Sequence, residues 1–372
     1  MYQIDLTLYK ESKQYFQLFD ILLKDLNINK EAFLKEIGIS PSSYRKARTI
    51  EQNIGDKIIE QLCSALGYKK ATLSYIDDLE KFINKVYFDM YYKIYKSYYD
   101  DLEKVNQLLD ENSILFPVLK LLKMFLIANS QVDAGRVIKE NKSLFEEIKK
   151  YIFFFNEDLC ELVDVLSLLF EPTIPEKIMM KSYKNSLAYF SLSSRLCADK
   201  RYVESLFVGK KAEEVLVREK NYKRLLFLNV KMMHCLNSIH SYEDCYDIAS
   251  MQLLTLQSFV NTDYEYNATV KNLVVCCLPL KKFDYIIEIL EKKEYVTMTE
   301  LCCLLVALYC TDKEVYKQKF IKYKSMLNER DQIITDSLDK YLNYKDKKEL
   351  NKLEAPNIMD NLVYAIKITE IN

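Results

Sequence analysis

The sequence predicts an all-α protein, in which an N-terminal helix-turn-helix domain precedes an α-helical-repeat superhelix. Glycine and proline are sparse, at 5 and 6 in 372 residues, which suits long helices, whereas sandwiches, barrels and doubly wound sheets need turn glycines. Apolar residues recur at helical spacing, and one segment recurs about every 40 residues, which indicates stacked helical hairpins. We expect a helix-turn-helix domain over 1–70, linker or dimerisation helices over 71–112, and a helical-repeat domain over 113–372.

Two amphipathic stretches flank the predicted helix-turn-helix. Residues 13–26 form the first, with apolar side chains at Phe16, Phe19, Leu22, Leu23 and Leu26. Residues 54–66 form the second, with one face made of Ile54, Ile58, Leu62 and Leu66. Gly67 follows directly and is expected to end that helix as a C-cap.

The first half of the stretch 29–50 predicts a short helix and a tight turn. Asn29 is expected to cap the helix. Its buried face is expected to hold Ala32, Phe33 and Ile37. Gly38 stands where the helix must stop in a left-handed conformation, which is costly for a residue with a β-carbon.

The second half of this stretch predicts another short helix. Ser40 is expected to cap it, and Pro41 takes the first position, where a missing N–H loses nothing. Tyr44 and Ala47, three residues apart, are expected to face inward. Residues 37–50 carry three basic side chains and no acidic one. A compact basic helix after a glycine turn is typical of a helix-turn-helix that reads a DNA major groove.

The residues expected to contact a double-stranded DNA operator divide into two sets. Base edges would be read by Pro41, Ser42, Ser43 and Lys46. Phosphates would be bound by Lys30, Arg45 and Arg48. The alternative is a helical domain that is vestigial or binds protein, with its charges merely solvated.

Residues 72–85 predict a further helix, which can continue through a tyrosine-rich run to about residue 112. Near one face this run places Tyr87, Tyr91, Tyr95 and Tyr98. The stripe could form a dimer or ligand surface, but amphipathic packing at the edge of a helical core is the more usual role of such residues.

From residue 113 onward the pattern predicts antiparallel helix pairs. The predicted helices are 114–127, 131–140, 143–154, 157–169, 175–197, 201–218, 222–238, 242–257, 262–277, 282–292, 297–310, 312–326, 329–341 and 358–368. The segments 201–212, 241–252 and 282–293 align with one another, each with an aromatic second residue. This echo predicts TPR-like helical hairpins stacked around a concave face, with a period longer than the ~34 residues of a standard tetratricopeptide repeat.

Over residues 15–68 the sequence resembles the Xre/Cro-type helix-turn-helix of bacterial and phage regulators. The residues that carry this likeness are Phe33, Gly38, Ile39, Ser40, Ser42, Ser43 and Tyr44, followed by the helix ending LCSALGY. Lys30 and Arg48 depart from the family pattern, which often has glutamine and glutamate at these places. Both changes add positive charge, which suits phosphate contact and leaves base preference open.

An Xre-type head on degenerate helical repeats resembles the RRNPP group, the peptide-sensing transcription regulators of Gram-positive bacteria. The resemblance implies a homodimer in which a short signalling peptide, as in quorum sensing, binds the concave repeat surface and changes how the DNA-binding heads are presented. By their position on the first helix of each pair, the candidate peptide contacts are Asn185, Tyr189, Asn229, Met233, Asn267 and Lys271. Two rival functions stay open: an adaptor whose repeats bind a protein partner, and a mobile-element regulator with no small ligand.

The sequence offers little for catalysis. It has no glycine-rich phosphate loop, no H-E-x-x-H, no G-x-S-x-G and no zinc-ligand spacing, so we expect neither an enzyme nor a cofactor or metal. His234 beside Cys235 suggests a nucleophile pair, but adjacent helical residues point about 100° apart, which favours a core role. Ten cysteines without a C-x-x-C pair, and no apolar run near ~18 residues, indicate a cytoplasmic protein.

Overall fold

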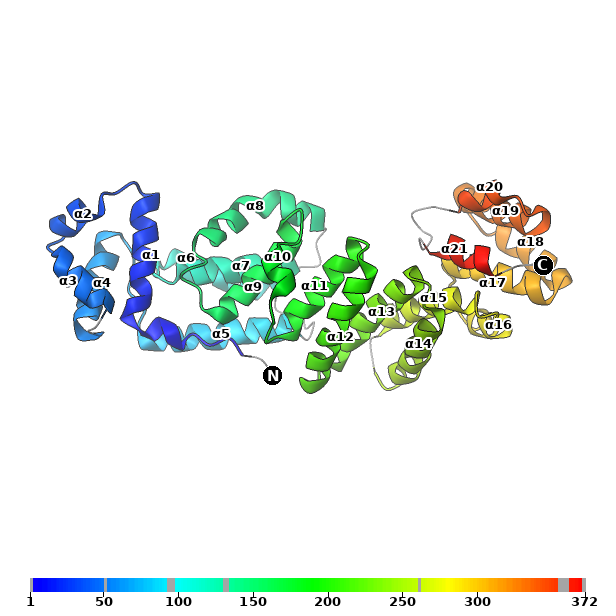
Figure 1. Cartoon of the computed structure of the whole chain (residues 1–372), viewed down its shortest axis with the longest axis horizontal. Coiled ribbons are helices and arrows are strands. Elements are labelled where there is room, and N and C mark those ends of the chain that lie inside the picture. Colours follow the sequence, from blue (N-terminus) through cyan, green and yellow to red (C-terminus); the bar gives the residue numbers. More distant parts are fainter. Residues whose placement is uncertain are drawn as a thin grey trace. The chain divides into compact units, whose positions relative to one another are not determined.

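A computed structural model describes residues 3–49, 52–91, 98–129, 134–259, 262–353 and 361–369 (Figure 1). Within these ranges the regular structure is helical, and strand-like pairing is limited to one isolated bridge between Lys69 and Ser113. The predicted all-α class is therefore confirmed. No helix in the described ranges is long and apolar enough to cross a membrane.

The chain divides into two compact units, the first made of residues 1–195 and 218–221 and the second of residues 196–217 and 222–372. The first unit begins with a short 3-10 helix and the four helices that we call the head: η1 (Thr7–Lys10), α1 (Ser12–Asp25), α2 (Lys30–Glu36), α3 (Pro41–Thr49) and α4 (Gln52–Ala65). It continues with α5 (Leu73–Tyr91), α6 (Tyr98–Asp110), α7 (Phe116–Asn129), α8 (Ala134–Lys150), α9 (Glu157–Phe170), α10 (Glu176–Met180) and most of α11 (Ser186–Ala198).

In the head, α1 packs on α3 and α4, and α3 packs on α2 and α4. Most of the predicted inward residues of α1 are buried, but Leu26 is 56% exposed because α1 ends one residue before it. The predicted burial of Ala32 is also wrong: it is exposed, and Leu34 packs inward beside Phe33. Tyr44 and Ala47 are buried, as their spacing predicts.

The predicted turn between α2 and α3 is present in full. The Asn29 Oδ1 atom accepts a hydrogen bond from the Ala32 N–H at 3.0 Å, which caps α2. Gly38 has a φ of +76°, in the left-handed region. The next amide, of Ile39, donates to the Leu34 carbonyl at 2.8 Å and closes the end of the helix.

The two other predicted caps of the head are also confirmed. The Ser40 Oγ atom accepts from the Ser43 N–H at 3.0 Å and so caps α3. Gly67, after α4, has a φ of +77°, and the Tyr68 N–H donates to the Cys63 carbonyl at 2.8 Å. Capping residues thus determine where α2, α3 and α4 begin or end.

The head is bound to the rest of the first unit through the residues that precede and begin α1. The Tyr9 hydroxyl donates to the Phe154 carbonyl at 3.0 Å, and the Gln14 side chain donates to the same carbonyl at 2.7 Å. The Ile4 N–H donates to Asn84 on α5 at 2.8 Å. Sequence patterns do not show these contacts, which join residues far apart in the chain.

The tyrosine-rich run contributes to the core of the first unit. Tyr87 and Tyr91 are buried, their rings stack with centroids 5.7 Å apart, and Tyr87 also stacks on Phe125 at 6.3 Å. The packing interpretation therefore holds for these two residues. Tyr95 lies outside the described residues, and Tyr98 is half-buried.

Two predicted helix boundaries in the first unit are wrong. The helices 131–140 and 143–154 are a single helix, α8, in which Asn141 donates to the Val137 carbonyl at 3.0 Å instead of interrupting the turn. The single helix 175–197 is two, α10 and α11, because Asn185 accepts from the Ala188 N–H at 2.9 Å and starts a new helix.

The second unit is a series of helical hairpins. Its remaining helices are α12 (Tyr202–Arg218), α13 (Tyr222–Ser238), α14 (Tyr242–Leu256), α15 (Asp263–Cys277), α16 (Phe283–Glu291), α17 (Met298–Thr311), α18 (Lys313–Lys324), α19 (Glu329–Tyr344), α20 (Lys347–Asn351) and α21 (Leu362–Ile368). From α12 to α17 the predicted ends are correct to within one residue, whereas α20 was not predicted. Helices α13, α15, α17 and α19 pack in succession, with α14 against both α13 and α15.

The predicted 40-residue echo corresponds to a repeated turn. Lys200, His240 and Lys281 have φ values of 60°, 67° and 54°. After each of them, the next amide donates to the carbonyl five residues earlier, at 2.9, 2.9 and 3.0 Å. The aromatic residue of the echo then begins α12, α14 and α16 in turn. The same turn therefore begins the second helix of three hairpins.

We expect replacement of Ser40 by alanine to destabilise α3 by about 1 kcal/mol, because the cap to the Ser43 N–H is lost. Hydrogen exchange of peptides covering α3 should then become about fivefold faster. Arg45→Ala is the matched control, since Arg45 is exposed on the same helix and takes no part in this cap. Equal exchange rates in the two variants would contradict the capping role.

Candidate nucleic-acid interface and a ligand pocket

The outward face of α3 carries the residues predicted to contact DNA. Pro41, Ser42, Arg45, Lys46 and Arg48 are exposed and Ser43 is half-buried. The opposite face is anchored, since the Tyr44 ring meets the Phe16 ring edge-on with centroids 5.1 Å apart. Helix α3 is therefore held from behind and presents a polar, basic surface.

A carboxylate on α1 joins three parts of the head. Asp20 lies 2.6 Å from the Lys30 Nζ atom on α2 and 3.1 Å from the Arg48 guanidinium on α3. The Tyr44 hydroxyl donates to Asp20 at 2.9 Å. Burial, together with the Asp20 carboxylate, raises the pKa of Tyr44, so the phenol stays protonated and keeps donating. We call these four residues the Asp20 cluster.

This cluster changes the expected roles of two predicted phosphate contacts. Lys30 and Arg48 are still 38% and 48% exposed, but their charges are partly balanced by Asp20. Lys30 also lies 4.3 Å from the centroid of the Tyr44 ring, a cation–π distance. Sequence reasoning assigned both residues to DNA and missed their positioning role.

Arg45 and Lys46 differ from these two. Neither forms an ion pair with any residue in the part of the chain that the structure describes. Their charges are therefore fully available to an external anion. The nearby hydroxyls are partly engaged, because Ser40 Oγ lies 2.9 Å from Ser42 Oγ and 2.8 Å from Ser43 Oγ.

The six predicted peptide contacts have different environments. In the first unit, Asn185 is fully buried, caps α11 and donates to Glu161, while the Tyr189 hydroxyl accepts from the Tyr183 N–H at 3.0 Å. In the second unit, Met233 is buried in the core. The remaining three reach the surface to differing degrees: Asn229 and Lys271 are half-buried and Asn267 is exposed. Their contact with a peptide stays a prediction.

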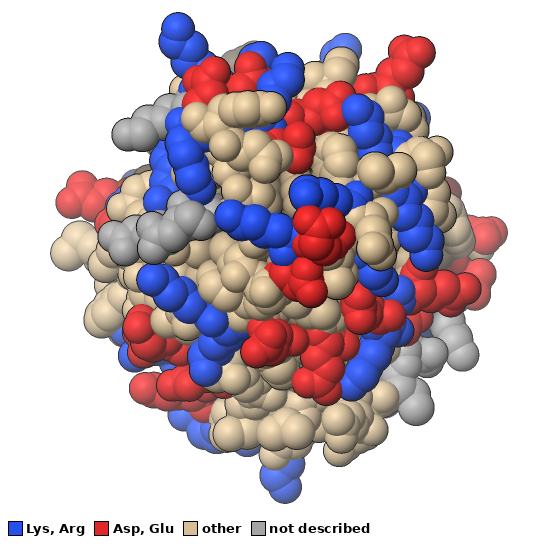
Figure 2. Space-filling view, turned by 90° about the vertical axis from the view of Figure 1, so that its right-hand side faces the viewer, with Lys and Arg blue, Asp and Glu red and all other residues tan. Residues whose placement is uncertain are grey.

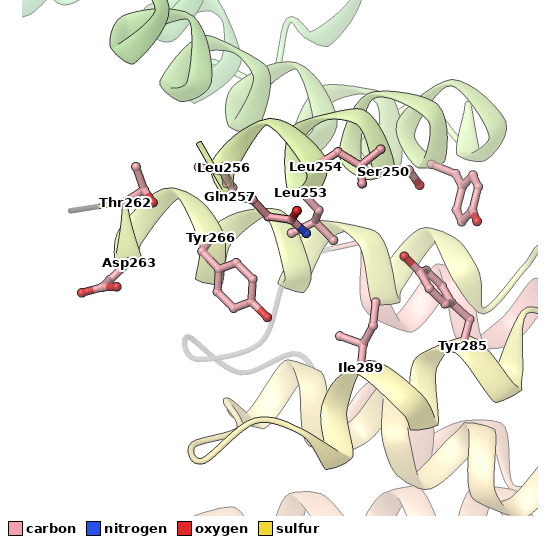
Figure 3. Close-up of a pocket in the computed structure, with 11 residues that line it drawn as sticks. Ser250, Leu253, Leu254, Leu256, Gln257, Thr262, Asp263, Tyr266, Tyr285 and Ile289 are labelled. Atoms are coloured by element: carbon pink, nitrogen blue, oxygen red, sulfur yellow. The ribbon is translucent and has the colours of Figure 1, made fainter. Parts of the chain in front are cut away.

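A pocket of about 560 Å³ lies between α14, α15 and α16 (Figure 3). It is lined by Tyr246, Ser250, Leu253, Leu254, Leu256, Gln257, Thr262, Asp263, Tyr266, Tyr285 and Ile289. The volume falls within the ~300–1,000 Å³ of small-ligand sites, and such sites combine an apolar lining with a few polar groups. None of the six predicted peptide contacts is part of this lining.

One polar atom of the pocket lining is buried without a partner within the described ranges. Among the described residues the buried Ser250 Oγ atom has no hydrogen-bond partner, which is costly unless a bound group or water provides one. Tyr246 and Tyr285 form an aromatic pair with centroids 6.1 Å apart. Figure 3 shows Tyr266 reaching from α15 toward α16 and Ile289 reaching back. The helical spacing of the α14 residues was the only sequence signal for this site.

The face of the chain shown in Figure 2 has no charged patch that would attract a ligand of opposite charge. There, acidic and basic side chains are interspersed, and neither sign forms a broad patch. The overall formal charge of −1 agrees with this mixture. This face therefore offers a polyanion no broad basic surface.

No protein-family model matches the chain, and neither does any curated protein or solved structure.

We expect Asp20→Ala to destabilise the head by about 2 kcal/mol, because the buried Tyr44 hydroxyl loses its shorter hydrogen bond and keeps only the 3.5 Å contact with the Phe16 carbonyl, and two cations lose their partner. Urea unfolding followed by circular dichroism measures the change. Asp78→Ala is the control: its ion pair with Lys81 is exposed on both sides and should contribute under ~1 kcal/mol. The double variant Asp20→Ala/Tyr44→Phe should lose less than the sum of the single changes, whereas strict additivity would argue against the coupling.

Proposed function

We propose that the chain is a DNA-binding transcription regulator that inserts α3 into the major groove. The observation that carries this proposal is that α3 has two different faces. On the outer face, Arg45 and Lys46 are exposed and form no ion pair with any described residue, and on the inner face Tyr44 and Ala47 are buried. A rigid helix with its polar side outward is what base reading requires, since positional errors weaken bidentate contacts. The Xre-type resemblance of residues 15–68 supports the same function.

The contact roles follow from exposure and charge. Lys46, with Ser42, Ser43 and Pro41, is assigned to base edges, because these residues form the outer N-terminal part of α3. Arg45 is assigned to phosphate. Lys30 and Arg48 are assigned to phosphate as secondary contacts, since the Asp20 carboxylate already offsets part of their charge.

A single head contacts too little DNA for strong selectivity, so we propose that two copies bind together. Two-fold pairing requires matching half-sites about 34 Å apart, or a multiple of that distance. The operator should accordingly be a pseudo-palindrome.

For the helical-hairpin region we propose a sensory role with a short signalling peptide as ligand, in line with the RRNPP resemblance. The observation in favour is the pocket between α14, α15 and α16, which pairs an apolar lining with the unpartnered Ser250 hydroxyl. Such a ligand can change DNA binding only if it binds one arrangement of the two heads in the dimer more tightly than another. An adaptor that binds a folded protein partner is the rival, and it would need no pocket of this kind.

The DNA role can be tested by selecting duplexes from a random pool with the full chain and using the enriched duplex as probe. We expect Ser43→Ala/Lys46→Ala to weaken binding at least about tenfold. Arg45→Ala should weaken binding to all sequences and reduce the slope of log K against log salt by about 1. Lys81→Ala, which removes an exposed cation on α5, is the control. No enrichment, or unchanged binding in the α3 variants, would remove α3 from this role.

The sensory role can be tested with a pooled library of short synthetic peptides, using thermal shift and then calorimetry. We expect Ile289→Trp to abolish binding by filling the pocket, and Ser250→Ala to weaken it about fivefold through loss of one hydrogen bond. Met251→Trp is the matched control, because Met251 lies on α14, is 66% exposed and does not line the pocket. Peptide binding that survives Ile289→Trp would place the ligand elsewhere.

A further inference from the structure

Asp20 on α1 uses both of its carboxylate oxygens to bind cations at the edge of the outer face of α3. Its Oδ1 atom lies 2.6 Å from the Nζ atom of Lys30, the first residue of α2. Its Oδ2 atom accepts from the guanidinium of Arg48, in the last turn of α3, at 3.1 Å. The two cations belong to different helices, so one carboxylate determines how far apart their charges lie.

A carboxylate between two cations is bound in the same way as a phosphate of the DNA backbone. Both groups are anions that present two oxygens, and lysine and arginine bind both through charge-assisted hydrogen bonds. Lys30 and Arg48 therefore already point at an anion, and at 38% and 48% exposure another anion can reach them. Ion pairs between partly exposed partners are weak, so a phosphate can compete with Asp20 for both cations.

The other two cations expected to meet DNA are not bound in this way. Arg45 and Lys46 are exposed, and neither forms an ion pair with a residue in the described ranges. A phosphate can approach these two without breaking an existing ion pair. Contact with Lys30 or Arg48, in contrast, takes a cation away from Asp20. Four cations on one surface thus differ in how readily they can bind a phosphate.

We infer that Asp20 is a positioning residue that limits sequence-independent DNA binding, and this inference rests on the DNA role proposed for α3. Before DNA binds, the carboxylate takes the place of a phosphate between Lys30 and Arg48. On a duplex it must release these cations before phosphates can bind them, and its own negative charge repels the DNA backbone. Attraction to a duplex is therefore reduced whatever its sequence. Lys46, the cation assigned to base edges, is not held by Asp20.

Weak sequence-independent binding is useful to a regulator, because non-operator DNA greatly outnumbers operator sites and competes with them. A purely structural role for Asp20 predicts the opposite effect on DNA. If the carboxylate served only to join α1, α2 and α3, its loss would loosen α3 and weaken binding. The sign of the change in affinity therefore distinguishes the two roles.

The test is Asp20→Asn in the full chain, which removes the negative charge and leaves a side-chain oxygen to accept from the Tyr44 hydroxyl. Binding to a fluorescent duplex of random sequence is followed by anisotropy over a salt series. We expect about tenfold tighter binding at low salt, and a slope of log K against log salt that is steeper by about 1 to 2, because two more phosphates are neutralised. Asp25→Asn is the matched control and should bind as the wild type does, because Asp25 is also on α1 but pairs with Lys150 of α8 at 3.8 Å.

A second comparison identifies the residues through which Asp20 acts. The double change Lys30→Ala/Arg48→Ala should remove the affinity gained in Asp20→Asn, and it should cost much less in the wild-type chain. This comparison remains decisive if Asp20→Asn lowers the stability of the head, because both proteins compared in that background carry the same asparagine.

Two outcomes count against the inference, and they differ in what they say about the proposed function. If Asp20→Asn binds random-sequence DNA no more tightly than the wild type or Asp25→Asn, the inference is overturned while the DNA role of α3 stands. If neither the wild type nor Asp20→Asn binds any duplex, the DNA role is overturned and the inference with it.

Discussion

The architecture depends on one way of ending a helix. A residue in the left-handed region stops the helix, and the next amide donates to the carbonyl five residues earlier, at 2.8–3.0 Å. This turn occurs at Asn27, Gly38, Gly67, Lys200, His240 and Lys281. It lets the following helix begin within a few residues and fold back on its predecessor. The head and the hairpin series, which look unrelated in sequence, are thus built with the same connection.

These turns also show that a low glycine content does not mean few left-handed turns. Sparse glycine indicated long helices and excluded glycine-rich folds, and the all-α class is correct. Left-handed turns are nevertheless frequent in this chain. In most of them the left-handed position is taken by lysine, histidine or asparagine instead of glycine. Such residues cost on the order of 1 kcal/mol each in that conformation. The packing of each hairpin must therefore offset strain that glycine would have avoided.

Local signals in the sequence predicted local structure well. Caps and helical spacing depend on residues three or four positions apart, so the Ser40 cap, the Gly38 turn and the buried Tyr44 could be foreseen. Asp20 could not, because its partner Arg48 is on another helix and no short-range pattern links a carboxylate to a distant cation. The pocket was missed for the same reason, because it is assembled from helices that meet only after folding.

The contacts of Tyr9 and Gln14 with the Phe154 carbonyl bear on how such a protein can evolve. Cutting the chain after the head would expose the buried ring of Tyr9 to water and remove the carbonyl that Tyr9 and Gln14 both contact. The head, which we propose to read DNA, therefore depends on its scaffold and should be a poor unit for domain shuffling. New operator preferences in this architecture would have to arise by point substitution on the outer face of α3, where side chains change without disturbing the anchoring beneath them.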